Sequence, residues 1–142
     1  MKIVTQYNDY ACFAACLESF LADNNREFDH KTFVAENPDL FNGGEAIEGA
    51  CDTQNFEEVA KRLGLQFSRV TEVPFAWNPP KETIFLFLWW KGDEGQKHCV
   101  RLHSPKKDST LVMNPVAGHG LETIPSAWVR GFFKFAIPET TK

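Results

Sequence analysis

The chain has 142 residues, of which 43% are hydrophobic and 24% are charged. This composition is typical of a single folded domain spanning residues 1–142 and excludes a disordered chain. Lys and Arg number 15 and Asp and Glu number 19, so the net charge is −4. Because there is no basic excess to attract a phosphate backbone, we expect no nucleic-acid partner.

No segment has the features of a membrane span or of a secretory signal. The longest uninterrupted apolar run covers residues 84–90, whereas a membrane-spanning helix needs about 20 apolar residues. The N-terminal residues turn polar within a few positions, unlike a signal peptide. We therefore expect a soluble, cytoplasmic protein. Export as an effector by a signal-less route stays open, and so does the oligomeric state.

The first half of the chain is patterned as helices. Residues 10–22 carry Ala, Leu and Phe at helical spacing, and Asn8 and Asp9 lie just upstream as candidate caps. A shorter helix is expected over about residues 30–36. Apolar residues at i, i+3, i+4 and i+7 predict a third helix over about residues 56–63.

The second half is patterned as strands. Aromatic and β-branched residues predict strands over 66–73, 83–90, 98–103, 109–114 and 132–137, with a short turn or helix over 126–129. A loop rich in turn-forming residues joins the third and fourth of these strands as a hairpin. Helices first and an antiparallel sheet second define an α+β domain, in which N-terminal helices pack on a C-terminal antiparallel sheet.

Cys12 is the residue that best fits a catalytic nucleophile. It falls in the first turn of the predicted helix, where unpaired backbone amides and the helix dipole favour an anion. The thiolate is such an anion, and it is the nucleophilic form of cysteine. For the cysteine alone, a small apolar residue packed into the core is the more frequent role.

The four cysteines, at 12, 16, 51 and 99, do not form a disulfide framework. Side chains four residues apart on a helix are too distant for a disulfide, and nothing in the sequence indicates an oxidising compartment. We therefore expect reduced thiols.

The predicted hairpin supplies a base for this nucleophile. A turn centred near Lys106 places His98 opposite Asn114, and opposed residues of an antiparallel pair point to the same face. Asn114 is then positioned to orient the His98 ring. The same register places His103 opposite Ser109, which orients an imidazole less well, so His98 is preferred among the four histidines.

An acyl-transfer site also needs donors for the oxyanion that develops on the attacked carbonyl. The backbone N–H of Cys12 is one candidate, and the side-chain amide of Gln6, six residues upstream, is a second. In chain order, Gln6, Cys12, His98 and Asn114 thus supply an oxyanion donor, a nucleophile, a base and an orienting group. This chemistry needs no metal and no other cofactor.

The ordered set resembles the papain-like cysteine peptidases of the bacteriocin-processing, double-glycine type. Those domains carry a glutamine, then Cys-Gly-x-Ala-Cys-Leu, later His-Phe-Val-Val followed by a hydrophobic residue, and finally Asp-Pro-x-x-Gly. The matching segments here read Cys-Phe-Ala-Ala-Cys-Leu, His-Cys-Val-Arg-Leu and Asn-Pro-Val-Ala-Gly. The resemblance spans most of the chain and implies a papain-like fold. It also implies that Gln6 serves the oxyanion hole, Cys12 is the nucleophile, His98 is the base and later the acid, and Asn114 orients the ring.

Three positions depart from that pattern. Asn114 stands where these peptidases usually have aspartate, and an asparagine can still orient the ring, as it does in papain. Phe13 replaces the glycine after the nucleophile and Ala11 replaces an acidic neighbour, so we expect both to contact the substrate. The bacteriocin-processing members are typically fused to a membrane transporter, so a Gly-Gly leader as the substrate stays open.

Other functions use the same residues. Zn²⁺ held by Cys12, Cys16, His98 and Cys99 is disfavoured, because adjacent strand residues point to opposite faces. A cysteine amidase, deamidase or transpeptidase passes through the same thioester. A degenerate domain without catalysis would bind a peptide beside the helix and the strand edge. The preferred hypothesis is a cysteine hydrolase that cleaves a peptide or isopeptide bond of a peptide or protein substrate.

Overall fold

The computed structural model describes residues 1–41, 49–71, 81–92 and 97–138. The described α-helices are α1 (Cys12–Asp23), α2 (His30–Glu36) and α3 (Phe56–Arg62). The strands are β1 (Gln66–Val70), β2 (Glu82–Trp89), β3 (Lys97–Ser104), β4 (Ser109–Asn114), β5 (Gly120–Pro125) and β6 (Val129–Ala136). Short 3-10 turns are η1 (Thr53–Asn55), η2 (Trp90–Gly92) and η3 (Ser126–Trp128).

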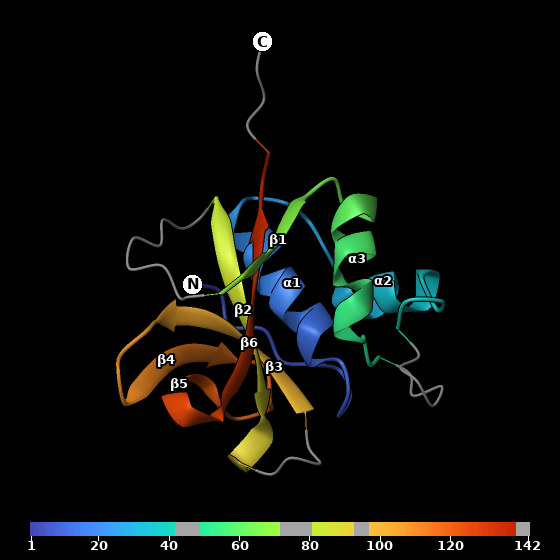
Figure 1. The fold of residues 1–142 in the computed structure, drawn as a ribbon. Coiled ribbons are helices and arrows are strands. Elements are labelled where there is room, and N and C mark those ends of the chain that lie inside the picture. Colours follow the sequence, from blue (N-terminus) through green and yellow to red (C-terminus); the bar gives the residue numbers. More distant parts are fainter. Residues whose placement is uncertain (42–48, 72–80, 93–96, 139–142) are drawn as a thin grey trace.

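The strands form one antiparallel sheet in the order β1-β6-β2-β3-β4-β5. Figure 1 shows the helices gathered on one side of the sheet, where α1 contacts β3, α3 contacts β1 and α2 packs against α1. This arrangement confirms the predicted α+β architecture, with N-terminal helices packed on a C-terminal antiparallel sheet. Of the described helices, none is long and apolar enough to cross a membrane.

The second and third helices form where local sequence favours them. At the start of α2 the Asp29 side chain accepts a hydrogen bond from the Thr32 backbone N–H at 3.1 Å, which is a side-chain N-cap. After α3 the chain turns at Gly64, whose φ of +68° lies in the region that glycine adopts without strain. Both predicted helices are confirmed.

The first helix begins later than predicted, and the expectation that Asn8 or Asp9 caps it is wrong. Ala11 is the N-cap of α1 and provides no side-chain hydrogen bond. The Asn8 side chain instead accepts a hydrogen bond from the Tyr10 N–H at 2.9 Å, closing a local turn two residues long. Consequently no side-chain cap covers the first amides of α1.

One strand was not predicted from the sequence. β5 pairs with the whole of β4, from Ser109 opposite Pro125 to Asn114 opposite Gly120. The other strands match their predicted positions to within a few residues, although residues 72 and 73 of the first predicted strand lie outside the described residues. The added strand matters for the site because it lies beside the residue expected to orient the base.

The sheet has an apolar cluster on each face, because successive strand residues point to opposite sides. Phe85 belongs to the cluster beneath the helices, whereas its neighbour Leu86 belongs to the cluster on the other face. Phe13 of α1 is only 2% exposed and stacks on Phe56 of α3 with ring centroids 3.9 Å apart. This stacking fastens α1 and α3 together over the sheet.

A buried arginine ties α1 to β3. The Arg101 side chain is fully buried and lies 2.5 Å from the Asp23 carboxylate, with further hydrogen bonds to Ser19 at 2.8 Å and Thr83 at 2.6 Å. A buried charge is tolerated only where it is paired in this way. The network joins Arg101 of β3 to Ser19 and Asp23 of α1 and so holds that strand against the helix. Arg101 lies three positions after His98, the predicted base, on the same strand.

Candidate active site

Cys12 is the first residue of α1, and its sulfur lies against β3. The Cys99 backbone N–H donates a hydrogen bond to Cys12 Sγ at 3.3 Å. Since two backbone bonds join that nitrogen to the Cα of the preceding residue, Cys12 Sγ lies within about 6 Å of His98 Cα. The structure therefore brings together the predicted nucleophile and the strand position of the predicted base.

Burial decides the protonation state of Cys12. Burial, and then the neighbouring Cys16, raise the pKa of the Cys12 thiol to about 12, although the amides of Cys99, Phe13 and Cys12 itself act to lower it. The helix N-terminus thus acts in the expected direction, but removal of the sulfur from water outweighs it. The helix start therefore favours the thiolate as expected, but burial has the larger effect, raises the pKa of Cys12 and so favours the neutral thiol.

The predicted contact between His98 and Asn114 is present. His98 Nε2 lies 2.8 Å from Asn114 Oδ1, and the two residues are 6% and 1% exposed. An amide oxygen can only accept, so the ring carries its proton on Nε2 and leaves Nδ1 unprotonated. This is the tautomer that a base needs if Nδ1 is to accept the proton of a thiol.

The register that produces this contact differs from the predicted one. β3 and β4 pair Arg101 with Met113 and Leu102 with Val112, which is two residues away from direct opposition of His98 and Asn114. A shift of two residues keeps every side chain on its face, whereas a shift of one reverses it. His98 and Asn114 therefore meet diagonally across the pair, a distance that long side chains span.

The environment of His98 favours its neutral form. Burial lowers the pKa of His98, and the hydrogen bond with Asn114 and the charge of Glu122 only partly oppose this effect. The ring of Trp90 packs against the imidazole with centroids 4.9 Å apart. Trp90 was expected to lie within the buried strand, but it follows β2 in η2, where its ring packs against the His98 imidazole.

Gln6 lies on the segment that leads into α1. Its backbone N–H donates to the carbonyl of Pro115 at 2.8 Å, which places it beside the residue that follows Asn114. Its side-chain Nε2 donates to the carbonyl of Asn8 at 2.8 Å. A primary amide has two N–H groups, so one remains for another acceptor.

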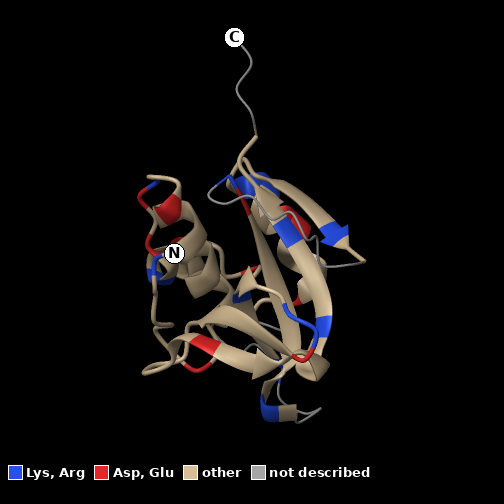
Figure 2. Cartoon of the chain, turned by 90° about the vertical axis from the view of Figure 1, so that its left-hand side faces the viewer, with Lys and Arg blue, Asp and Glu red and all other residues tan. Residues whose placement is uncertain are grey.

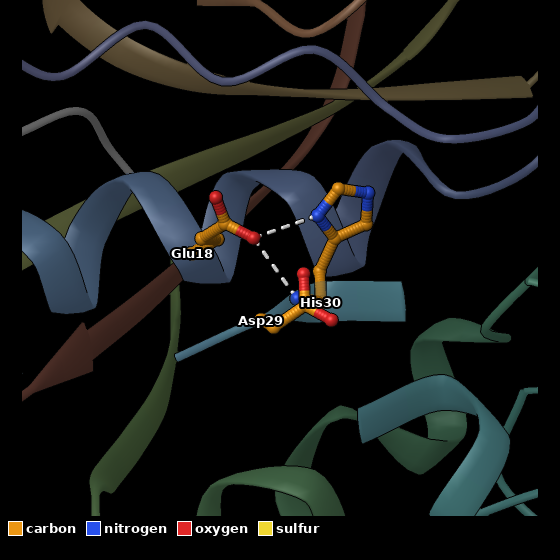
Figure 3. Close-up of side chains that lie close together, drawn as sticks. All are labelled: Glu18, Asp29 and His30. Carbon is orange, nitrogen blue, oxygen red and sulfur yellow. Dashed lines mark hydrogen bonds and ion pairs between the residues drawn. The ribbon is translucent and has the colours of Figure 1, made fainter. Parts of the chain in front are cut away.

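A polar cluster of Glu18, Asp29 and His30 holds the segment that leads into α1. Figure 3 shows Glu18 of α1 between the imidazole and the backbone amide of His30 at the start of α2. The other ring nitrogen, Nε2, accepts from the Tyr7 N–H at 3.1 Å. Glu18, Asp29 and His30 are the only described residues whose potential ligand atoms gather closely enough for a metal. Because both ring nitrogens already have partners, the cluster serves to hold Tyr7, the neighbour of Gln6.

Two further sequence expectations are corrected by the placement of the side chains. Phe13 and Ala11 were expected to contact the substrate. Instead, the Phe13 ring is enclosed by other phenylalanines and Ala11 is fully buried. Phe13 is thus a core residue, because the aromatic surface of α3 and of the sheet meets the side of α1 on which it lies.

The four cysteines are all free, as expected. Cys16 is buried, and its thiol lies 3.7 Å from the Cys99 carbonyl oxygen. The thiols expected in the zinc alternative do not join a cluster of three close ligand atoms among the described residues.

Charged residues are dispersed over the described elements. Figure 2 shows basic and acidic segments interspersed on helices and strands. Sequence reasoning missed one acidic residue close to the site. Glu122 of β5 accepts a hydrogen bond from the Asn114 side chain. Residues 120–125 read Gly-Leu-Glu-Thr-Ile-Pro, in which two polar residues separate the apolar ones, so no period-2 signal predicts that strand.

Comparisons with known proteins agree with this architecture. No protein-family model matches the sequence, and no curated protein matches it significantly. Among solved structures, the peptidase domain of Streptococcus ComA, a bifunctional ABC transporter of a quorum-sensing pathway, superposes with a TM-score of 0.73 at 14% identity. The match covers 97% of this chain and 98% of that one.

Two further solved structures are similar. The peptidase domain of Streptococcus mutans ComA has a TM-score of 0.61 at 13% identity, over 97% of this chain and 100% of that one. A double-glycine-motif protease of an AMS/PCAT transporter, solved with its leader peptide, has a TM-score of 0.62 at 17% identity, over 96% and 91% of the two chains. The chain therefore shares the papain-like fold of these transporter peptidase domains.

Proposed function

We propose that this protein is a cysteine hydrolase that cleaves a peptide bond, with Cys12 as nucleophile and His98 as base. The observation that carries the proposal is the contact of Cys12 Sγ with the Cys99 N–H, one residue from a His98 ring held by Asn114. The shared fold of known cysteine peptidase domains supports it.

The reaction starts from a neutral thiol and a neutral imidazole. As Cys12 Sγ attacks the peptide carbonyl, its proton moves to His98 Nδ1, and the carbonyl oxygen becomes an oxyanion. The N–H of Cys12 and the second side-chain N–H of Gln6 donate to that oxyanion.

The intermediate then collapses to products. The C–N bond breaks, the imidazolium of His98 gives its proton to the leaving amine, and a thioester remains on Cys12. His98 next deprotonates a water that attacks the thioester, releasing the carboxylic acid and the thiol. Asn114 holds the ring throughout. A different acceptor at this last step would make the protein a transpeptidase, and a side-chain amide substrate would make it an amidase or deamidase.

The proposed substrate is an extended peptide. The transporter protease of the same fold was solved with a leader peptide, and we carry that ligand class, though not its Gly-Gly sequence, to this chain. A strand of substrate beside the start of α1 brings its carbonyl to Cys12, with backbone hydrogen bonds supplying affinity.

Cleavage of a peptide library, followed by mass spectrometry, tests the proposal. Peptides that end their leader in Gly-Gly are included as one subset. We expect Cys12→Ala and His98→Ala to lower kcat/KM at least about a thousandfold. Cys51→Ala is the matched control, because Cys51 is, like Cys12, a free cysteine that is intermediate between buried and exposed as a residue, and it should retain activity.

Two results would contradict the proposal. Cleavage that survives Cys12→Ala would assign the activity to other residues. Peptides that bind both the wild type and Cys12→Ala, with no cleavage by either, would instead identify a peptide-binding domain.

A further inference from the structure

The amide of Asn114 is held at both ends by groups of fixed hydrogen-bonding character. Its Oδ1 accepts from His98 Nε2 at 2.8 Å and from the Val116 backbone N–H at 3.1 Å. Its Nδ2 donates to the carboxylate of Glu122. A backbone N–H can only donate and a carboxylate can only accept, so both partners select the same amide orientation.

That orientation determines the chemistry of His98. With Oδ1 toward the ring, Nε2 must carry the proton and Nδ1 is the free base. If the amide were reversed, its Nδ2 would face Nε2 and select the opposite tautomer, in which Nδ1 carries the proton. The two groups that fix this orientation, Glu122 and the Val116 N–H, therefore control which ring nitrogen can act as a base.

Glu122 is itself held in place. His119 Nδ1 lies 2.9 and 2.8 Å from the two carboxylate oxygens of Glu122. The Trp90 ring packs against the imidazoles of both His119 and His98, at 5.6 and 4.9 Å between centroids. The side chain of Glu122 is 28% exposed, so water screens its charge only partly.

The negative charge of Glu122, beside Asn114, favours the protonated form of His98. A Cys-His-Asn set contains no carboxylate of its own, and the imidazolium that forms when His98 accepts a proton is stabilised by a nearby anion. Glu122 is separated from the ring by one amide group, and its charge acts to raise the pKa of His98, whereas burial, the largest effect, and the neighbouring His119 act to lower it.

We propose that Glu122 is a positioning residue that acts on His98 through Asn114, fixing the amide orientation and supplying the anion that the asparagine lacks. The kinetic part of this inference rests on the proposed function. The structural part, the tautomer and titration of His98, does not.

Nitrogen-15 NMR of the His98 ring provides a test that is independent of cleavage. Wild type should show the Nε2–H tautomer. Glu122→Gln keeps an acceptor for Asn114 but removes the charge, so the tautomer should persist while the pKa of His98 falls by about one pH unit. Glu122→Leu removes the acceptor as well and leaves only the Val116 N–H to select the orientation, so a fraction of the opposite tautomer should appear. Glu57→Gln, at an exposed position of α3, is the matched control and should resemble wild type.

Kinetics with a cleaved peptide give the second readout. Glu122→Gln should lower kcat/KM about ten- to a hundredfold, mainly through kcat. Asn114→Asp alone should also lower it, because two carboxylates then face each other. The double variant Asn114→Asp/Glu122→Gln should recover most of the activity, because the charge has moved into position 114 and residue 122 can donate to it.

The outcomes separate the two proposals. An unchanged tautomer and titration midpoint of His98 in folded Glu122→Gln and Glu122→Leu would overturn the role of Glu122. If Glu122→Leu does not fold, an unchanged midpoint in Glu122→Gln alone would overturn it. If the wild type cleaves no peptide, the proposed function fails, while the NMR result still decides whether Glu122 positions His98.

Discussion

Iodoacetamide should alkylate Cys12 at pH 7 roughly fifty times more slowly than it alkylates an unburied thiol. A pKa of about 12, against an ordinary value of 9.0, leaves about one thousandth as much thiolate at any pH well below both values. The more basic thiolate is intrinsically more nucleophilic, by about fifteen- to thirtyfold at a Brønsted slope near 0.4–0.5. The product of the two effects is a rate lower by about thirty- to sixtyfold.

The pH dependence is the more specific part of this prediction. The rate at Cys12 should rise about tenfold for each pH unit from 6.5 to 9.5 without reaching a plateau, because the thiol remains mostly protonated over that range. His98→Ala should change this rate less than about threefold, since the neutral imidazole does not stabilise a thiolate before substrate binds.

The assay is alkylation with isotopically labelled iodoacetamide, followed by peptide mapping to separate the cysteines. The same chain unfolded in urea is the internal reference, because Cys12 should then react like an ordinary thiol. Fast labelling of native Cys12 at pH 6 that is lost in His98→Ala would refute the reasoning, since it would reveal a thiolate–imidazolium pair in the resting protein.

Three further predictions concern the base and the core. Burial lowers the pKa of His98, so the base stays deprotonated in more acidic solution. In the pH profile of kcat/KM, the midpoint of the loss of activity toward acid should therefore lie below about pH 6.5. A midpoint above pH 7 would contradict this. Phe13→Ala should lower the free energy of unfolding in urea by about 3–5 kcal/mol without altering cleavage-site preference, whereas a small loss with altered preference would make Phe13 a groove residue. Asp23→Ala leaves the buried Arg101 charge without its carboxylate and should cost about 3 kcal/mol, or about 6–12 °C in Tm; Asp23→Leu combined with Arg101→Met should recover much of this loss.

Elements that depend on residues a few positions apart could be predicted from the sequence. α3 follows from apolar spacing and from Gly64 after its last turn. The β3–β4 hairpin follows from a turn-rich loop between two apolar runs. These patterns depend on residues a few positions apart, so no knowledge of the remaining chain was needed.

Part of the site was also accessible from sequence. The pairing of His98 with Asn114 was predicted from a register that differs by two residues from that of the structure. The prediction survived because the alternation of side chains repeats every two residues, so the face was right even though the direct partner was not.

Tertiary packing sets which side chains lose contact with water and which distant groups then face them. Local residue patterns are enough to place Cys12 at the start of a helix, where backbone amides point at its sulfur. Its protonation depends instead on burial against β3, and the same kind of packing encloses Phe13 and brings Glu122 to Asn114. Amide alignment is a property of neighbouring residues, whereas desolvation and charge proximity are sums over the whole fold, and for Cys12 the desolvation is the larger effect.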